Sequence, residues 1–123
     1  MRTKGFEIES TVSEYLQKQG IELVTRNFSC KMGEIDIVCK DKRNAKHPEV
    51  LVFIEVRYRK NTSYGGAAES VTYTKQQKLI RTAQYYLMCN TWGQHLPCRF
   101  DVMAVSLENN LPKIDWIQDA FQS

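Results

Sequence analysis

Two different spacings of apolar residues occur along this chain, and each predicts its own kind of element. Within residues 7–19 the apolar side chains recur every three or four positions, the spacing of one helical face, and Gly20 follows as a stop signal. The helical spacing returns after Thr74, which together with Gln77 forms a capping-box pattern. The apolar face of this second predicted helix comprises Leu79, Ile80, Ala83, Tyr86 and Leu87. The pattern therefore predicts two helices in separate parts of the chain.

Short apolar runs, several with alternating polarity, predict the strands. They cover residues 21–29, 34–40, 50–59 and 100–107, and a short last strand follows Pro112 near Ile114 and Trp116. The resulting order is α-β-β-β-α-β-β. Because a helix joins the third strand to the fourth, these two strands can pair in parallel after an antiparallel hairpin region. An α/β fold with a mixed sheet flanked by helices is therefore expected.

Two carboxylates interrupt the apolar runs of predicted strands. Asp36 lies within Gly-Glu-Ile-Asp-Ile-Val at 33–38, and Glu55 lies within Val-Phe-Ile-Glu-Val-Arg at 52–57. An ionised carboxylate in such a run is costly unless a cation or a hydrogen-bond donor compensates it. If the two strands are neighbours, both side chains converge near one sheet edge. This pair is the best indication of function in the sequence.

Strict alternation along a strand assigns each of these side chains to a face. In residues 50–59 it places Glu55 beside Arg57, on the face that also holds Leu51 and Phe53. In residues 34–40 it groups Asp36 with Glu34 and Val38, and the opposite face then holds Ile35, Ile37 and Cys39.

A collinear series of short motifs runs from about Gly5 to Phe121. It consists of Gly5-x-x-Ile8-Glu9-x-x-Val12-x-x-Tyr15-Leu16, Arg26-Asn27-Phe28, Gly33-Glu34-Ile35-Asp36, Val52-Phe53-Ile54-Glu55-Val56-Arg57, Tyr64-Gly65, Glu69-Ser70-Val71, Lys75-Gln76-Gln77-Lys78 and Arg99-Phe100-Asp101-Val102. This series resembles the successive motifs of the YraN-like family. The resemblance implies a restriction-endonuclease-like fold, similar to that of Holliday junction resolvases in the PD-(D/E)xK nuclease superfamily.

The resemblance also implies a role for three acidic residues. Phosphodiester hydrolysis needs a positioned water and charge stabilisation on the phosphate, which Mg²⁺ or Mn²⁺ held by carboxylates can supply. Asp36 and Glu55 are the expected metal ligands, and Glu9 on the first predicted helix is the third. The structural alternatives are a surface glutamate at position 9, an ion pair of Asp36 with a basic residue, and an ion pair of Glu55 with Arg57 or Arg59.

Arg57 departs from the pattern of many related nucleases, which carry lysine at this position. Arginine stays protonated and cannot act as a general base, although it can clamp a phosphate. Lys75, at the start of the second predicted helix, is the expected substitute because helix amino termini attract phosphate. A solvated lysine is the alternative. Arg57 and Lys75 complete the candidate catalytic set.

Further basic residues predict a track for the phosphates of a nucleic acid. Those singled out are Lys42, Arg43, Arg59, Lys60 and Lys78. A solvated charge run is the competing interpretation for the loop that carries the first two. The preference for DNA, and for branched DNA, follows from the resemblance to junction resolvases alone.

Composition agrees with this interpretation without requiring it. With 123 residues, of which 42% are hydrophobic, the chain suits one domain over residues 1–123. The net charge of +3 is a weak indication of nucleic-acid binding. No apolar run approaches the roughly 18 residues of a membrane span, and the expected location is cytoplasmic.

The four cysteines, at positions 30, 39, 89 and 98, form no C-x-x-C pair. Buried free thiols are the expectation, ahead of a disulfide or a zinc site. Asp101 has a basic neighbour in Arg99, which favours a structural role for this carboxylate.

The function that these observations favour is a metal-dependent endonuclease acting on branched or otherwise structured DNA. A binding module that retains the nuclease fold without cleaving is the alternative, and Arg57 is its main support. A third interpretation, a protein-interaction adaptor, predicts no salt-sensitive nucleic-acid binding. A homodimer would place two sites on opposed strands.

Overall fold

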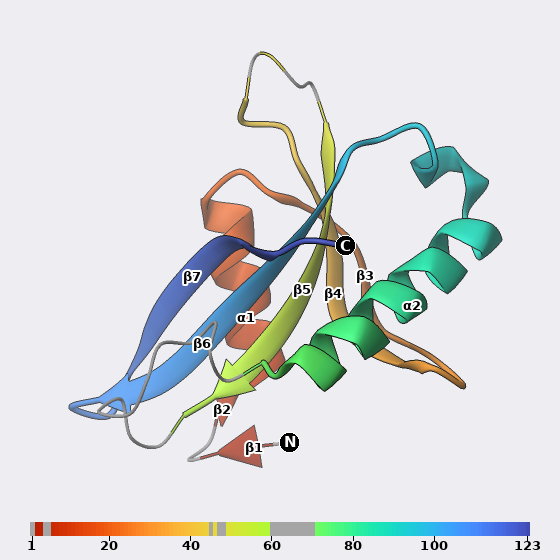
Figure 1. The fold of residues 1–123 in the computed structure, drawn as a ribbon. Helices are drawn as coiled ribbons and strands as arrows, with labels where there is room; N and C mark the ends of the chain where they lie inside the picture. Colours follow the sequence, from red (N-terminus) through yellow and green to blue (C-terminus); the bar gives the residue numbers. More distant parts are fainter. Residues whose placement is uncertain (1, 4–5, 45, 47–48, 60–70) are drawn as a thin grey trace.

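The computed structural model describes residues 2–3, 6–44, 46, 49–59 and 71–123. Its main feature is a five-stranded sheet in the order β3-β4-β5-β6-β7 (Figure 1). The strands are β3 (Glu22–Cys30), β4 (Gly33–Asp41), β5 (Val50–Tyr58), β6 (Cys98–Glu108) and β7 (Leu111–Phe121). Strands β5 and β6 pair in parallel, and the other neighbours pair antiparallel. The mixed sheet and the α-β-β-β-α-β-β order are confirmed. A small hairpin, β1 (Arg2–Thr3) and β2 (Phe6–Glu7), precedes them and was not predicted.

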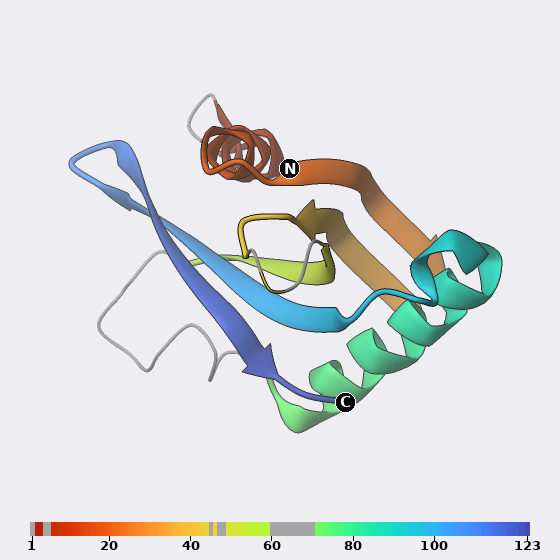
Figure 2. The same ribbon diagram turned by 90° about the horizontal axis from the view of Figure 1, so that it is seen from above.

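One helix covers each face of the sheet. Helix α1 (Ile8–Lys18) lies behind the sheet in Figure 1, and α2 (Tyr73–Cys89) lies in front; the view from above separates the three layers (Figure 2). A short 3-10 helix, η2 (Thr91–Gly93), follows α2 and leads into β6. Because α2 belongs to the connection from β5 to β6, it allows these strands to run in the same direction. Neither helix of the described chain is long and apolar enough to cross a membrane.

Two apolar cores form, one under each helix. Val12 and Leu16 of α1 are fully buried against strand residues that include Ile54. On the other face, α2 buries residues such as Ala83 and Tyr86 against Phe53, in a cluster that extends to Phe100 and Phe121. Burying one large apolar side chain contributes roughly 1.5–3 kcal/mol, so both faces stabilise the sheet. The predicted faces of β5 are confirmed, because Leu51 and Phe53 lie in the α2 core, whereas Val52 and Ile54 lie in the α1 core.

The N-cap of α2 lies two residues earlier than predicted. Thr72 is the N-cap: its backbone is extended, and its side-chain oxygen accepts a hydrogen bond from the Lys75 amide at 3.3 Å. The prediction of Thr74 as the cap was wrong, since Thr74 already lies inside the helix. The buried side chain of Val71 fixes the chain against the α2 core directly before the helix. This anchoring selects Thr72 from two threonines that the sequence does not distinguish.

The last strand is longer than predicted. Strand β7 pairs with β6 from Phe100 opposite Phe121 to Glu108 opposite Leu111. Asn109 and Asn110 connect the two strands with φ angles of 53° and 64°. Asparagine adopts this left-handed conformation readily, and two such residues are typical of a tight β-hairpin. The exposed charged residues of β7 hide its alternation, so its length depends on pairing with β6.

All four cysteines are free, as expected, but their burial differs from the expectation. Cys39 is buried, and burial raises the pKa of its thiol to about 12. Cys30 is half-buried, whereas Cys89 and Cys98 are exposed. The prediction of buried thiols is therefore correct only for Cys39, the cysteine in the middle of the sheet.

Candidate active site

Asp36 lies where strands β4 and β5 separate. The β4–β5 ladder runs from Asp41 opposite Val50 to Ile37 opposite Ile54. At the next position, the Asp36 carboxylate accepts a hydrogen bond from the Val56 backbone amide at 2.7 Å. A side-chain oxygen thus takes the place that a strand carbonyl would occupy in a continuing ladder. This bond holds Asp36 against β5 beside Glu55.

The separation of the strands also changes the predicted faces of β4. Ile35 lies with Val38 in the core under α2, whereas Ile37 and Cys39 lie in the core under α1. The prediction that Ile35 shares a face with Ile37 and Cys39 was therefore wrong. In β3, Asn27 lies between the paired positions Arg26–Ile37 and Phe28–Ile35 and has a left-handed φ of 57°. This backbone conformation interrupts regular alternation next to Asp36.

The carboxyl groups of Asp36 and Glu55 interact through a hydrogen bond, which raises the pKa of Glu55 and opposes the raised pKa of Asp36. Burial is the main cause that raises the pKa of Glu55 from 4.5 to about 7, and the negative charge of Asp36 raises it further. Burial also raises the pKa of Asp36, although the Val56 amide opposes that shift. Two partly desolvated carboxyl groups in contact cannot both ionise without a compensating positive charge.

The pair opens into a pocket on the α2 side of the sheet. Its volume is about 360 Å³. Strand residues form one wall and the first turns of α2 form the other; the lining residues are Gly33, Glu34, Asp36, Glu55, Lys75, Lys78 and Leu79. Two acidic side chains of the pair thus face a wall that presents two ammonium groups.

Two of the predicted cations lie close to Glu55. An Arg57 guanidinium nitrogen is 3.5 Å from a Glu55 carboxylate oxygen, the ion pair that the sequence left as a structural alternative. Lys75 lines the pocket, and its positive charge acts to lower the pKa of Glu55. Both charges favour ionised Glu55, but burial and Asp36 outweigh them. The structure therefore brings Arg57, Lys75 and the acidic pair together.

Glu9 approaches the same pair from the opposite layer. It lies in the first turn of α1, and its negative charge contributes to the raised pKa of Asp36. A Glu9 carboxylate oxygen is 3.5 Å from an Arg26 guanidinium nitrogen. The third predicted acidic residue is thus near enough to act electrostatically on Asp36, although α1 and α2 cover different faces.

The basic residues of the predicted phosphate track do not all lie near the pocket. Lys78 lines the pocket, and the backbone amide of Arg59, just after β5, bonds to the Val105 carbonyl at 2.8 Å. Lys42 and Arg43 follow the far end of β4, roughly 20 Å from Asp36 at about 3.3 Å per residue. Lys42 is in an ion pair with Glu22 at 2.6 Å. Lys60 lies outside the described residues.

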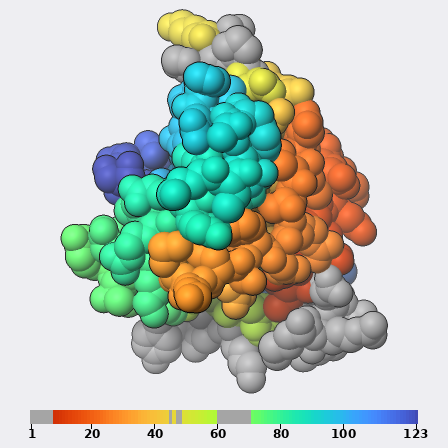
Figure 3. Space-filling model, turned by 90° about the vertical axis from the view of Figure 1, so that its right-hand side faces the viewer, coloured from red at the N-terminus to blue at the C-terminus, as the bar shows by residue number. Residues whose placement is uncertain are grey.

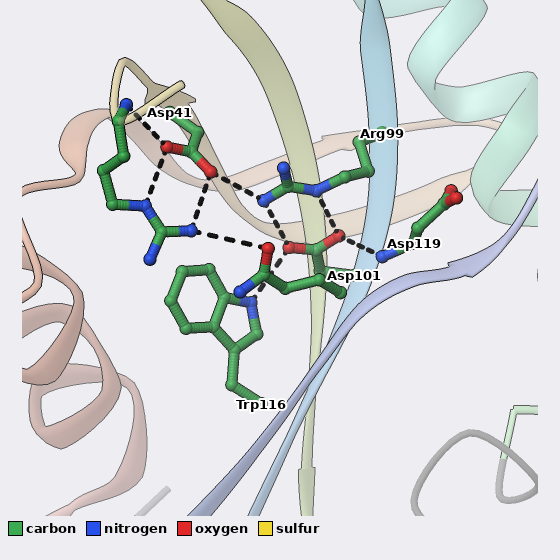
Figure 4. Close-up of polar contacts among 7 residues, drawn as sticks. Asp41, Arg99, Asp101, Trp116 and Asp119 are labelled. Atoms are coloured by element: carbon green, nitrogen blue, oxygen red, sulfur yellow. Dashed lines mark hydrogen bonds and ion pairs between the residues drawn. The ribbon is translucent and has the colours of Figure 1, made fainter. Parts of the chain in front are cut away.

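Arg43 belongs to a second polar cluster at that far end, because it pairs with Asp41. Figure 4 shows Asp41, Asp101 and Trp116 of this cluster. The Arg43 guanidinium forms two hydrogen bonds to the Asp41 carboxylate, at 2.8 and 2.9 Å, and lies over the Trp116 ring at 4.6 Å. These bonds hold the pKa of Asp41 well below its usual range. Arg99 joins Asp41 to Asp101, as Figure 4 shows, so Arg43 is held in a network between strands.

The buried Asp101 carboxylate is fully satisfied within this network. Arg99 donates to it at 2.9 and 3.0 Å, the Trp116 indole at 2.9 Å, and the Asp119 backbone amide at 2.9 Å. Asp119 has a left-handed φ of 54° at an irregularity in the β6–β7 register, which directs its amide to Asp101. The structure accounts for Asp101 as an anchor of β7, in agreement with the sequence.

Glu34 is a pocket residue that the sequence reasoning did not select. It lines the pocket, and its negative charge contributes to the raised pKa of Asp36. Its position two residues before Asp36, on the same predicted face, was the available signal. Gly33 was likewise passed over; a Cβ there would lie 3.1 Å from the Thr82 hydroxyl, so the hairpin packs closely on α2.

The acidic pair has the chemistry of a Mg²⁺ site. In the described part of the chain, no group of three or more histidine, cysteine or acidic side chains is arranged to hold a metal ion. Mg²⁺ needs fewer protein ligands, because it usually keeps several waters and binds one or two carboxylates. The contacting oxygens of Asp36 and Glu55 fit this requirement, and a divalent cation would supply the charge that lets both ionise.

Comparison with known proteins places this chain in a family. The chain matches the model of the family described as "Uncharacterised protein family UPF0102" over residues 8–105. A UPF0102 protein of Nitrosococcus oceani is 43% identical over 121 residues, which cover 98% of this chain and 93% of the relative. A UPF0102 protein of Stutzerimonas stutzeri is 42% identical over 123 residues, covering 99% and 97% respectively. One from Pseudomonas syringae pv. syringae is 44% identical over 121 residues, covering 97% and 93%.

Proposed function

This chain belongs to the uncharacterised protein family UPF0102, and from that membership and the acidic pair we propose that it is a metal-dependent endonuclease acting on structured or branched DNA. The observation that carries the proposal is the contact between the Asp36 and Glu55 carboxyl groups in a pocket with Lys75 and Lys78. The proposal includes the finer fold assignment, the restriction-endonuclease-like fold of the nucleases that the YraN-like motifs resemble. It also keeps the expected cytoplasmic location, which rests on the sequence alone.

Asp36 and Glu55 would hold Mg²⁺, or Mn²⁺ in its place. When bound, the ion would supply Lewis acidity toward a phosphoryl oxygen and toward water. The Val56 amide keeps Asp36 oriented, because its bond at 2.7 Å occupies one carboxylate oxygen. Glu9 would add negative charge on the α1 side of the site and strengthen its preference for a cation.

Lys75 and Arg57 have different roles in this proposal. The ammonium of Lys75 lines the pocket and would contact the phosphate or the attacking water. Arg57 would stabilise negative charge on the phosphate, since a guanidinium binds phosphate oxygens but stays protonated. Neither role needs Arg57 to accept a proton.

A panel of labelled single-stranded, duplex, flap and four-way-junction DNA tests the activity. The wild type is expected to cut in Mg²⁺ or Mn²⁺ and not in EDTA, and Asp36→Asn and Glu55→Gln are expected to lose cutting while they keep their fold. Glu108→Gln is the matched control, because Glu108 is an exposed carboxylate paired with Lys113 at 3.7 Å, far from the pocket in sequence and on another strand. Cutting by Asp36→Asn or Glu55→Gln at the wild-type rate, or cutting in EDTA, contradicts the proposal.

The second candidate is a nucleic-acid-binding module of the same fold that does not cleave. The ion pair between Arg57 and Glu55 favours it, because a cation that pairs with Glu55 competes with a metal. This candidate predicts DNA binding that is unchanged by EDTA, with no cutting of any substrate in the panel. A homodimer acting on opposed strands remains part of the endonuclease proposal.

A further inference from the structure

Basic side chains of the described chain fall into two groups, those in ion pairs and those without one. The paired residues include Arg26, Lys40, Lys42, Arg43, Arg57, Arg99 and Lys113. Within the described residues, no ion pair involves the cations that gather on and beside the first half of α2, which are Lys31, Lys75, Lys78 and Arg81. Unpaired cations at one place leave positive charge available to a polyanion.

These cations belong to one continuous face. Lys78 lines the pocket, and Arg81 lies one helical turn further along α2. The β3–β4 hairpin, which carries Lys31 at its turn, lies beside α2 (Figure 3). A Cβ on Gly33 would lie 4.0 Å from the Lys78 Cβ, so the hairpin and the helix touch at this point. The positive face therefore begins at the pocket and extends across both elements.

An aromatic ring follows the cations on the same side of α2. Tyr85 comes one turn after Arg81 and keeps 38% of its surface exposed. Its ring is 6.3 Å from that of Phe28 in β3, at an angle of 36°, which supports it from the hairpin side. Cations beside an exposed aromatic ring are the combination that binds a single strand of nucleic acid, because phosphates meet the cations and a base stacks on the ring.

We propose that a nucleic-acid strand bound at the pocket continues as a single strand across α2 and the β3–β4 hairpin. Lys78, Arg81 and Lys31 contact its phosphates, and Tyr85 stacks on one base. A duplex hides its base faces, so the substrate has unpaired nucleotides beside the phosphate in the pocket. This inference rests on the proposed function, since it places the bound strand at the acidic pair, but its test does not require cleavage.

Binding of labelled oligonucleotides in EDTA tests the inference. The probes are a single-stranded DNA of about 12 nucleotides, an RNA of the same sequence, the corresponding duplex, and polyphosphate as competitor. The wild type is expected to bind the single strands more tightly than the duplex. Lys31→Glu combined with Arg81→Glu is expected to weaken binding at least tenfold and to lower the salt slope by about 1.4, or roughly 0.7 per lost phosphate contact.

Matched variants test whether DNA binding depends on the Tyr85 ring and on the position of the cations, and not only on the net charge. Tyr85→Ala is expected to weaken single-strand binding about tenfold, whereas Tyr85→Phe keeps the ring and the affinity. Lys18→Glu on α1 makes the charge change of one of these two substitutions on the other layer and is expected to bind normally. Thermal melting checks that each variant is folded, and Lys31→Ala and Arg81→Ala replace the double variant if it does not fold.

Three results with the variants and the duplex would overturn the inference. They are equal weakening by Lys18→Glu, unchanged affinity in Tyr85→Ala, and duplex binding as tight as single-strand binding. Complete displacement of DNA by polyphosphate at equal phosphate concentration would show that charge alone accounts for DNA binding. It would therefore overturn the stacking role of Tyr85. Loss of cutting in Asp36→Asn with normal binding would separate this face from the proposed catalysis. If neither site variant affects cutting, the proposed function fails while the binding result stands on its own.

Discussion

Asp36 and Glu55 share a hydrogen bond between their carboxyl groups, and the Asp36 carboxylate also accepts a hydrogen bond from the Val56 amide. Asp36 is thus held by a backbone amide and by a neighbouring acid that would normally be ionised at neutral pH. Burial raises the pKa of Glu55 to about 7, and this value places its charge change in the neutral range. A cation and a proton therefore compete for the same pair of carboxyl groups.

The first prediction concerns stability against pH in the absence of metal. The pKa of Glu55 is raised from 4.5 to about 7, so its contribution to stability is fully present below pH 4.5 and is lost as the pH rises through about 7. Glu55→Gln, which is always neutral, is expected to gain on the order of 2–3 kcal/mol relative to wild type between pH 4 and pH 8. Chemical denaturation in EDTA measures this difference. Parallel pH profiles for the two proteins would show that Glu55 titrates normally, and Glu108→Gln serves as the control.

The second prediction concerns divalent cations. Mg²⁺ or Mn²⁺ at about ten times its Kd is expected to stabilise the wild type by about 1.4 kcal/mol, because the ion binds only the folded acidic pair. Such a gain raises the Tm by several degrees in a domain of this size. Thermal melting with and without the ion, at constant ionic strength, measures the shift. Asp36→Asn should show none; a shift of equal size in this variant would place the ion elsewhere.

The third prediction concerns the cluster of Figure 4. Arg99→Met removes both guanidinium bonds to the fully buried Asp101 carboxylate and one to Asp41. Breaking a buried pair by removing one partner leaves an uncompensated charge, so a loss of about 3–5 kcal/mol in the free energy of unfolding is expected. Denaturant titration measures it. Lys113→Met, which removes an exposed pair with Glu108, should lose less than about 1 kcal/mol. Similar losses in both variants would mean that the burial of Asp101 does not increase the free-energy cost of removing its partner.

The fourth prediction distinguishes the two threonines at the start of α2. Thr72→Ala removes the oxygen that accepts the Lys75 amide and is expected to lower the free energy of unfolding by about 1 kcal/mol. Thr74→Ala, inside the helix, should be neutral or slightly stabilising because alanine is the better helix former. The pair is compared by denaturant titration. The opposite order would restore Thr74 as the cap.

Strand β5 was predictable because its alternation is strong on both faces. Leu51 and Phe53 reach one core and Val52 and Ile54 the other, so hydrophobic burial alone determines which face Glu55 joins. The same reasoning failed at Ile35 in β4. There a left-handed Asn27 on the neighbouring strand interrupts regular alternation, and a one-dimensional pattern does not contain the conformation of a paired strand.

The sequence identified charged side chains that make specific contacts, but it did not predict which residues they contact. Arg43 stands in a basic loop and was expected to contact phosphate, yet it binds Asp41 and lies over Trp116, 73 positions further along the chain. Its partner depends on how β7 folds back beside β6. The convergence of Asp36 and Glu55 was predictable because those strands are adjacent, whereas their shared proton follows from burial that only the folded chain provides.

The donors to Asp101 also bear on the order of events during synthesis. Arg99 lies on the same strand, but the Trp116 indole and the Asp119 amide lie on β7, the last element of the chain. A nascent chain that has not reached residue 116 therefore buries this carboxylate without two of its donors, or leaves it in water. Either alternative disfavours the finished sheet, because an unsatisfied buried charge is costly. Residues 36 and 55, although made early, are expected to acquire their stable framework only when the ribosome has delivered the final strand.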